Sequence, residues 1–254
     1  MLSGLLGEFL LFLVHLAINV LVAVRNVYHQ FWAAKGSLPR CEVTRKDISM
    51  IMEHVPRFSK RLNHLLVLTD TEHHSLSDLA RVVIWSLVAG IPYVSFHDIT
   101  GNLKQDEEKL FLEIEQHKKG VPGYIKWANK PDLNGYTNGT SSHTVVINIF
   151  NSHDGRPKIA QCISQIAKEC TQSGESCKEL TVEDLNYRLN SIYPSIPDPE
   201  LVVYTGPVCI TNGLLPWQIR LTEFIQLSLD HSVNVSSYIG ALYKYNKCDQ
   251  RFGK

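Results

Sequence analysis

The chain has 254 residues, and its 25 Lys and Arg residues balance 25 Asp and Glu residues, so the formal net charge at pH 7 is zero. This length fits one large α/β domain with an extension, or two small domains. The neutral balance excludes the basic surface typical of nucleic-acid-binding proteins. The six cysteines include no C-x-x-C pair, which argues against a zinc knuckle.

A mostly apolar stretch over residues 5–24 is long enough to cross the core of a bilayer. Basic residues follow it, so the positive-inside rule places the larger C-terminal part in the cytosol. We therefore expect a membrane anchor, a transmembrane helix, within residues 1–30. A helix lying in the membrane interface is the alternative. Two sequons, at Asn138 and Asn234, would accept glycans in a lumenal domain and would stay bare in the cytosol.

A linker and an amphipathic helix are expected over residues 31–60, because apolar residues recur there at helical spacing. A buried strand over residues 65–68 and a capped helix over residues 76–87 follow, and Gly90 ends that helix. The next strand covers residues 92–96. Strand, helix and strand within about thirty residues predict a βαβ unit and therefore a parallel sheet.

Ligands of parallel sheets bind beyond the carboxyl ends of the strands. This rule directs attention to residues 70–74 and to His97 and Asp98, which follow or end the two strands. His73 and His74 lie beside a carboxylate but are adjacent, and adjacent residues do not point the same way. Their spacing argues against a metal site formed by this pair.

The remaining pattern continues the alternation of helices and strands. In chain order it predicts a helix over residues 104–118, a mobile loop over 120–142, a strand over 144–149, helices over 157–170 and 181–189, a strand over 201–204 and a helix over 237–248. Apolar residues within 214–229 suit a core or an interface. The expected fold class is α/β, with a central parallel sheet flanked by helices and an N-terminal transmembrane helix.

The last residues include Arg251, Phe252 and Gly253, an Arg-x-Gly sequence. A guanidinium group is a planar, permanently charged fork that suits a phosphate. Glycine lets its backbone N–H approach an anion closely. We expect this tail to bind a diphosphate in a site built mainly by another chain. An ordinary frayed terminus is the alternative.

Three stretches resemble the cis-prenyltransferases, the family of undecaprenyl and dehydrodolichyl diphosphate synthases. They are Asp198–Val203, Leu214–Gln218, and Trp85 with the Gly90-Ile91 pair. The resemblance implies the undecaprenyl diphosphate synthase-like fold over residues 61–254. Residues 215–223 and 251–254 further resemble the membrane-anchored, non-catalytic subunits of dehydrodolichyl diphosphate synthase, those of the Nogo-B receptor type.

The departures from the family pattern concern the groups that hold substrate. Active members place Asp-Gly-Asn and basic residues after the first strand, whereas this chain has Asp70 followed by Thr71 to His74. Active members also carry two arginines after the late strand, and residues 204–211 of this chain contain none. The resemblance therefore implies an accessory subunit that is not catalytic alone.

By the same resemblance, the chain pairs with a catalytic cis-prenyltransferase subunit in a heterodimer or higher heteromer at the endoplasmic reticulum membrane. Arg251, Phe252 and Gly253 would reach the partner's isopentenyl diphosphate, while the partner would bind the allylic diphosphate and most of the Mg²⁺ shell. Glu223 matches an acidic family residue near the metal, but a surface charge explains it equally well. The product would be the polyprenyl precursor of dolichol for protein glycosylation.

Two other functions stay open at this point. The chain could be a membrane receptor or scaffold that uses the fold to bind protein, which would suit a lumenal or extracellular domain. It could also be an autonomous cis-prenyltransferase, against which the missing arginines argue.

Overall fold

The computed structural model describes residues 8, 11–16, 19–20, 40–129, 143–173, 180–193 and 195–249. The chain divides into two compact units, Met1–Val43 and Thr44–Lys254. Among the residues described in this way, no helix combines the length and the apolar character needed to cross a membrane. The predicted anchor within residues 1–30 lies mostly outside the described residues, and it stays a prediction.

A six-stranded sheet with all neighbours parallel forms the centre of the second unit, in the order β3-β4-β2-β1-β5-β6. The strands are β1 (His64–Thr69), β2 (Tyr93–Asp98), β3 (Tyr124–Trp127), β4 (Thr144–Asn151), β5 (Leu201–Thr205) and β6 (Glu223–Ser228). Because the strands are parallel, their carboxyl ends lie along one edge of the sheet. The predicted α/β class with a central parallel sheet is confirmed.

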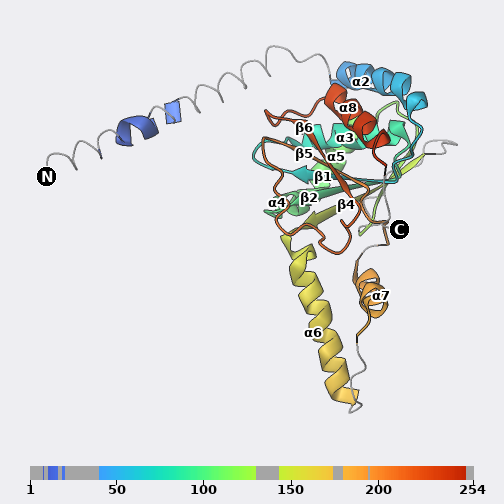
Figure 1. The fold of residues 1–254 in the computed structure, drawn as a ribbon. Coiled ribbons are helices and arrows are strands. Elements are labelled where there is room, and N and C mark those ends of the chain that lie inside the picture. Colours follow the sequence, from blue (N-terminus) through green and yellow to red (C-terminus); the bar gives the residue numbers. More distant parts are fainter. Residues whose placement is uncertain are drawn as a thin grey trace. The chain divides into compact units, whose positions relative to one another are not determined.

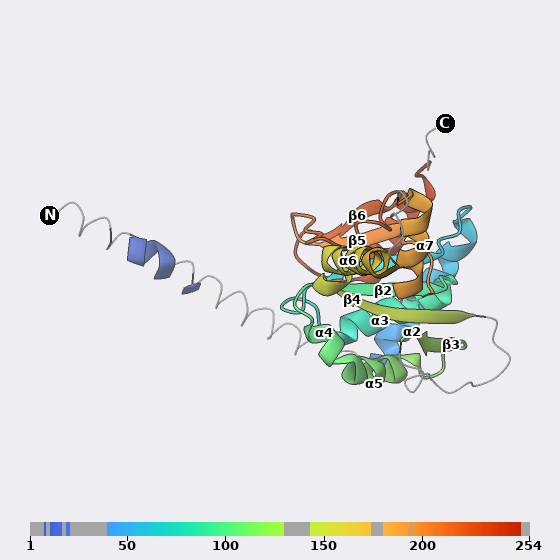
Figure 2. The same ribbon diagram turned by 90° about the horizontal axis from the view of Figure 1, so that it is seen from below.

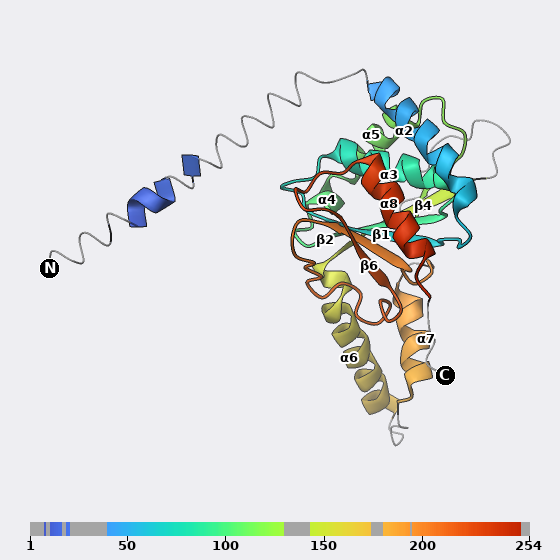
Figure 3. The same cartoon turned by 45° about the horizontal axis from the view of Figure 1, so that its top comes forward.

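Helices cover the sheet on both faces (Figures 1 and 2). They are α2 (Arg40–His54), α3 (Leu76–Ala89), α4 (Asn102–Gln105), α5 (Glu107–Lys118), α6 (Arg156–Ser173), α7 (Val182–Ile192) and α8 (Val235–Asn246), with 3₁₀ turns η1 (Val55–Arg57) and η3 (Ser152–Asp154). Figure 3 shows α3, α5 and α8 together on one side, and α6 and α7 extend from the other.

Alternation along the strands produces two cores of unequal size. In β1, Leu65 and Val67 join the large core, which contains residues of α3, α5 and α8. Leu66 faces the opposite way and joins a small core with Phe150, Val202 and residues of the 214–215 turn. The other face of β1 therefore packs against a smaller apolar cluster.

The βαβ unit forms as the sequence predicts. Ser75 and Asp78 make the expected capping box, and Gly90 ends α3 in the left-handed conformation with φ 75°. Three predictions were incomplete or wrong. The predicted loop 120–142 contains strand β3, the segment 214–229 contains strand β6, and the predicted helix 104–118 breaks at Asp106 into α4 and α5.

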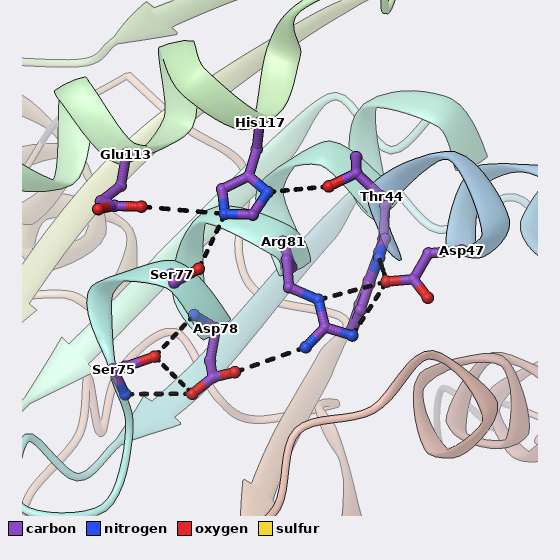
Figure 4. Close-up of polar contacts among 9 residues, drawn as sticks. Thr44, Asp47, Ser75, Ser77, Asp78, Arg81, Glu113 and His117 are labelled. Atoms are coloured by element: carbon purple, nitrogen blue, oxygen red, sulfur yellow. Dashed lines mark hydrogen bonds and ion pairs between the residues drawn. The ribbon is translucent and has the colours of Figure 1, made fainter. Parts of the chain in front are cut away.

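A buried polar network fixes the part of α2 from Thr44 onward against α3 and α5 (Figure 4). Asp47 Oδ2 accepts hydrogen bonds from Arg81 Nε at 3.2 Å, Arg81 Nη2 at 3.0 Å and Trp85 Nε1 at 3.1 Å. His117 of α5 bridges Thr44 Oγ1 and Ser77 Oγ, at 2.9 and 2.8 Å. Side chains of three helices thereby satisfy one another's buried polar atoms.

A second buried histidine joins β1 to β2 and to the connection before β5. His64 Nδ1 lies 2.6 Å from the carbonyl oxygen of Pro197, so it donates the proton. Nε2 then accepts from Ser95 Oγ at 2.8 Å. Burial lowers the pKa of His64 to about 4, although the Pro197 carbonyl and Glu200 act in the opposite direction. His64 is therefore neutral in the folded protein at pH 7.

We expect acid to destabilise the protein through His64. The unfolded side chain takes up a proton near pH 6.5, whereas the folded one does so near pH 4, so the unfolded state binds more protons between these values. Stability is present above pH 6.5 and falls as the pH drops toward 4. At pH 5 the loss from His64 alone is about 2 kcal/mol, measurable by urea unfolding at pH 7.5 and 5.

His64→Gln is the comparison, because it removes the titration and keeps an amide that can donate to Pro197. Burial also lowers the pKa values of His74 and His97, so part of the acid sensitivity should persist in this variant. An equal loss of unfolding free energy between pH 7.5 and 5 in both proteins would contradict the assignment to His64.

Candidate functional site

A pocket of about 340 Å³ lies at the carboxyl edge of the sheet, where β1, β2 and β5 end. Its lining comprises Leu68, Thr69, Asp70, Thr71, Glu72, His97, Asp98, Ile99, Thr100, Tyr204, Thr205, Val208, Ile210, Asn212 and His231. The sequence directed attention to residues 70–74 and to His97 and Asp98; of these, residues 70–72, His97 and Asp98 line the pocket, whereas His73 and His74 do not.

Asp70 follows β1 directly and organises the turn after it. Its backbone carbonyl accepts from the N–H groups of His73 and His74, and its Oδ1 accepts from the Glu72 N–H at 3.0 Å. Its Oδ2 lies 2.8 Å from His73 Nδ1. Burial raises the pKa of Asp70, but the bonds from Glu72 and His73 together lower it by more, so the net pKa is below its ordinary value. The carboxylate is therefore ionised at neutral pH.

His74 points away from His73 and holds the turn onto β5. Its Nδ1 accepts from the Asp70 N–H at 3.1 Å, which leaves the proton on Nε2. Nε2 donates to Thr205 Oγ1 at 2.9 Å. Burial lowers the pKa of His74, consistent with this neutral form. The two adjacent histidines do point in different directions, as the sequence predicted.

The amino end of α3, which follows this turn, is already occupied by the chain's own side chains. Ser75 Oγ accepts from the Asp78 N–H at 3.1 Å, and Asp78 Oδ2 accepts from the Ser75 N–H at 3.2 Å. Amide groups at a helix start attract anions. Here a carboxylate already lies at that position, so α3 offers little to a diphosphate.

The charge of the pocket is unfavourable for a diphosphate. Among the described residues that line it are three carboxylates, Asp70, Glu72 and Asp98, and neither Lys nor Arg. Asp98 accepts from the N–H groups of Thr100 and Leu103, so it serves the turn into α4. Near a protein surface, two like charges 4 Å apart repel by about 4 kcal/mol. The described lining residues therefore offer a diphosphate no cationic Lys or Arg side chain.

Mg²⁺ does not fit the three-residue group of potential ligands found near this pocket. Within the described part of the chain, the three-residue group placed to hold an ion is Asp70, His73 and His231. It offers one carboxylate and two imidazoles, whereas Mg²⁺ prefers an octahedral shell of oxygen ligands. This donor set suits a softer divalent ion better than Mg²⁺.

Of the predicted site residues, the structure describes Glu223 and not the three residues of the tail. Arg251, Phe252 and Gly253 lie outside the described residues, so their role stays a prediction. Glu223 begins β6 and pairs with Leu201 at the amino edge of the sheet, opposite the edge that carries Asp70. Its role at a metal is likewise not tested, but it shares no pocket with Asp70 within the described part of this chain.

His231 is the site residue that the sequence analysis missed. It follows β6, and that strand was not predicted, so nothing indicated that this loop reaches the ligand edge. Its ring stacks on His73 with centroids 4.1 Å apart and planes at 18°. Had β6 been predicted as a sixth parallel strand, the position of a histidine shortly after it would have indicated that His231 lies at this edge of the sheet.

Comparison with known proteins gives close sequence relatives, although no family model matches the chain. The mouse dehydrodolichyl diphosphate synthase complex subunit Nus1 is 31% identical over 75% of this chain and 64% of its own length. The human subunit NUS1 is 31% identical over 74% and 65%. The chain is thus similar in sequence to the NUS1 subunits over about three quarters of its own length. It spans just under two thirds of the length of these two relatives.

More distant matches come from bacterial enzymes. An isoprenyl transferase of Listeria monocytogenes is 23% identical over 82% of this chain and 90% of its own. The solved structure of a probable undecaprenyl diphosphate synthase from Campylobacter jejuni covers 76% of this chain at 15% identity, with a TM-score of 0.48. That structural likeness is too distant to support an argument about the site. The parallel α/β sheet agrees with the fold class that the sequence predicts.

Proposed function

We propose that the chain is a non-catalytic, activating subunit of a heteromeric dehydrodolichyl diphosphate synthase. Its partner would be a catalytic cis-prenyltransferase subunit, and the complex would add isopentenyl units to an allylic diphosphate to make the polyprenyl precursor of dolichol. Sequence similarity to the NUS1 subunits supports the assembly.

One observation supports the proposal that this chain is not catalytic by itself. The pocket at the carboxyl edge is lined by three carboxylates and, among its described residues, by neither Lys nor Arg. A diphosphate of two to three negative charges needs charge-assisted donors, each contributing roughly 1.5–3 kcal/mol. The amino end of α3 cannot substitute for them, since Ser75 and Asp78 occupy it.

The Arg-x-Gly sequence at Arg251 to Gly253 would provide such donors to the partner. The guanidinium group of Arg251 would bind the diphosphate of isopentenyl diphosphate through two parallel hydrogen bonds. The Gly253 N–H would approach a phosphate oxygen, which no larger residue allows as closely. Donors placed there would hold isopentenyl diphosphate in position for its double bond to attack the allylic carbon of the other substrate. The Mg²⁺ that this chemistry needs would be held mainly by the partner, because the group of Asp70, His73 and His231 does not suit it.

The membrane location belongs to the same proposal. The apolar stretch over residues 5–24 and the basic residues after it support an anchor in the endoplasmic reticulum membrane with the larger unit in the cytosol. Asn234, whose side chain is exposed at the amino end of α8, lies in a sequon whose glycosylation state reports this orientation.

The test is reconstitution from purified parts. We expect no isopentenyl incorporation by this chain alone, little by the catalytic subunit alone, and at least tenfold more by the two together. The catalytic subunit mixed with a truncated chain ending at Asp249 is the matched control, because it keeps the described fold and lacks the tail. Incorporation by this chain alone would overturn the proposal, and so would a mixture no more active than the catalytic subunit.

A further inference from the structure

Three potential ligands converge at the carboxyl edge of the sheet from two loops far apart in sequence. Asp70 and His73 lie in the turn after β1, and His231 lies in the loop after β6. One ligand atom from each lies within 4.8 Å of the other two. The strand between these loops, β5, is followed by Gly206, which makes the approach of His231 sterically feasible.

Gly206 is the reason that His231 can reach its neighbours. A Cβ atom at position 206 would come 2.5 Å from His231 Cε1, so any other residue there would displace the ring. His231 itself adopts φ 60°, which is uncommon outside glycine. The loop is thus built to hold this imidazole over the end of β5 and against His73.

The orientation of His73 and His231 leaves nitrogen atoms directed at the group. His73 Nδ1 faces Asp70 Oδ2 at 2.8 Å, and the two imidazole rings are stacked. His231 Nδ1 lies 3.4 Å from Thr205 Oγ1, an oxygen that can orient the ring from behind. His74 takes no part, because both of its nitrogens already make hydrogen bonds.

We propose that Asp70, His73 and His231 form a binding site for a divalent transition-metal ion such as Zn²⁺. Two imidazoles and one carboxylate are a donor set that zinc binds with a fourth position open. Bond lengths of about 2.0–2.2 Å put tetrahedral ligands roughly 3.3 Å apart. The side chains of Asp70 and His73 are 43% and 45% exposed, so they can close the remaining gap by rotation.

A second observation points to a polar ligand beside this site. His97 lines the same pocket as Asp70 and His231 and is only 2% exposed. Within the described part of the chain, neither of its ring nitrogens has a hydrogen-bond partner. Buried polar groups of this kind normally have one. An unsatisfied imidazole thus lies in the wall of the pocket that Asp70 and His231 also line.

The site is tested by titrating the purified full chain with Co²⁺ and Zn²⁺ in the presence of a non-thiol reductant. We expect one equivalent of Co²⁺ to give the visible absorption of a tetrahedral site, without the near-ultraviolet band of cobalt–thiolate bonds. Zn²⁺ should abolish that absorption. Absence of a saturable one-to-one spectrum in the wild-type protein would overturn the proposal, whatever the variants do.

His73→Asn and His231→Asn are the informative variants, since asparagine tolerates the backbone conformation of residue 231. Each should weaken Co²⁺ binding by at least tenfold, because loss of a second-shell partner alone costs about that much. His153→Asn is the matched control, as His153 is exposed and outside the group, and it should bind Co²⁺ like the wild type. Equal affinity of all three variants for Co²⁺ would overturn the proposed metal site. The result does not depend on prenyltransferase activity.

Discussion

Replacing Arg81 by Met is expected to lower the free energy of unfolding by about 3 kcal/mol. The change leaves Asp47 charged and buried, with Trp85 Nε1 as its remaining donor among the three observed. The Asp47 side chain is 9% exposed and that of Arg81 is 19% exposed. Because neither side chain is fully buried, the expected loss of unfolding free energy lies at the lower end of the range for breaking a buried ion pair.

Two further proteins separate this cause from others. Arg57→Met is the matched control, because Arg57 is exposed and pairs with Glu53 one turn away on the surface. Such pairs contribute about 0.5 kcal/mol or less. Asp47→Asn combined with Arg81→Met should recover much of the loss, since the neutral amide oxygen still accepts from Trp85.

Equilibrium urea unfolding followed by tryptophan fluorescence measures all three proteins. A loss below about 1 kcal/mol for Arg81→Met would contradict the importance of the network that fixes α2 on α3. A double variant as unstable as the single one would show that lost packing of the arginine stem, rather than the unpaired charge, is responsible.

The sequence was most informative where local and long-range signals agree. Leu65 to Leu68, the Ser75–Asp78 box and Gly90 each specify one step of the β1–α3–β2 unit, and all three are found as predicted. Strand β3 was missed because its four residues lie in a segment rich in Gly, Pro and Asn. Strand β6 was missed because it lies at the sheet edge and leaves Phe224 partly exposed, which weakens the apolar signal.

The same reasons explain what could be predicted of the site. Asp70, His97 and Asp98 follow or end predicted parallel strands, so the topological rule locates them at the pocket. His231 follows the missed strand β6, and its approach to His73 depends on the missing side chain of Gly206. A contact between loops so far apart along the chain has no local sequence signal. Arg251 to Gly253 were identified from residue chemistry and resemblance alone.

Replacing Arg251 by Ala is expected to reduce isopentenyl incorporation by the complex about 10- to 150-fold. The range corresponds to losing one charge-assisted bond to the diphosphate, roughly 1.5–3 kcal/mol of transition-state stabilisation. The rate of the Arg251→Lys complex should lie between those of the wild-type and Arg251→Ala complexes, because lysine keeps the charge but cannot form two parallel hydrogen bonds. Association with the catalytic subunit should be unchanged, since the tail acts in the active site.

Arg57→Ala is the matched control for this measurement, because it removes an equally charged side chain from an exposed position of the fold. Gly253→Ala tests the second donor independently, and it should also lower the rate without releasing the partner.

The most direct test of the subunit account is therefore the initial rate of isopentenyl incorporation by co-purified complexes that carry the wild-type chain, Arg251→Ala or Arg57→Ala. We expect a loss of at least tenfold in the Arg251→Ala complex, the wild-type rate in the Arg57→Ala complex, and the same amount of bound catalytic subunit in all three. An Arg251→Ala complex that assembles and works at the wild-type rate would contradict it.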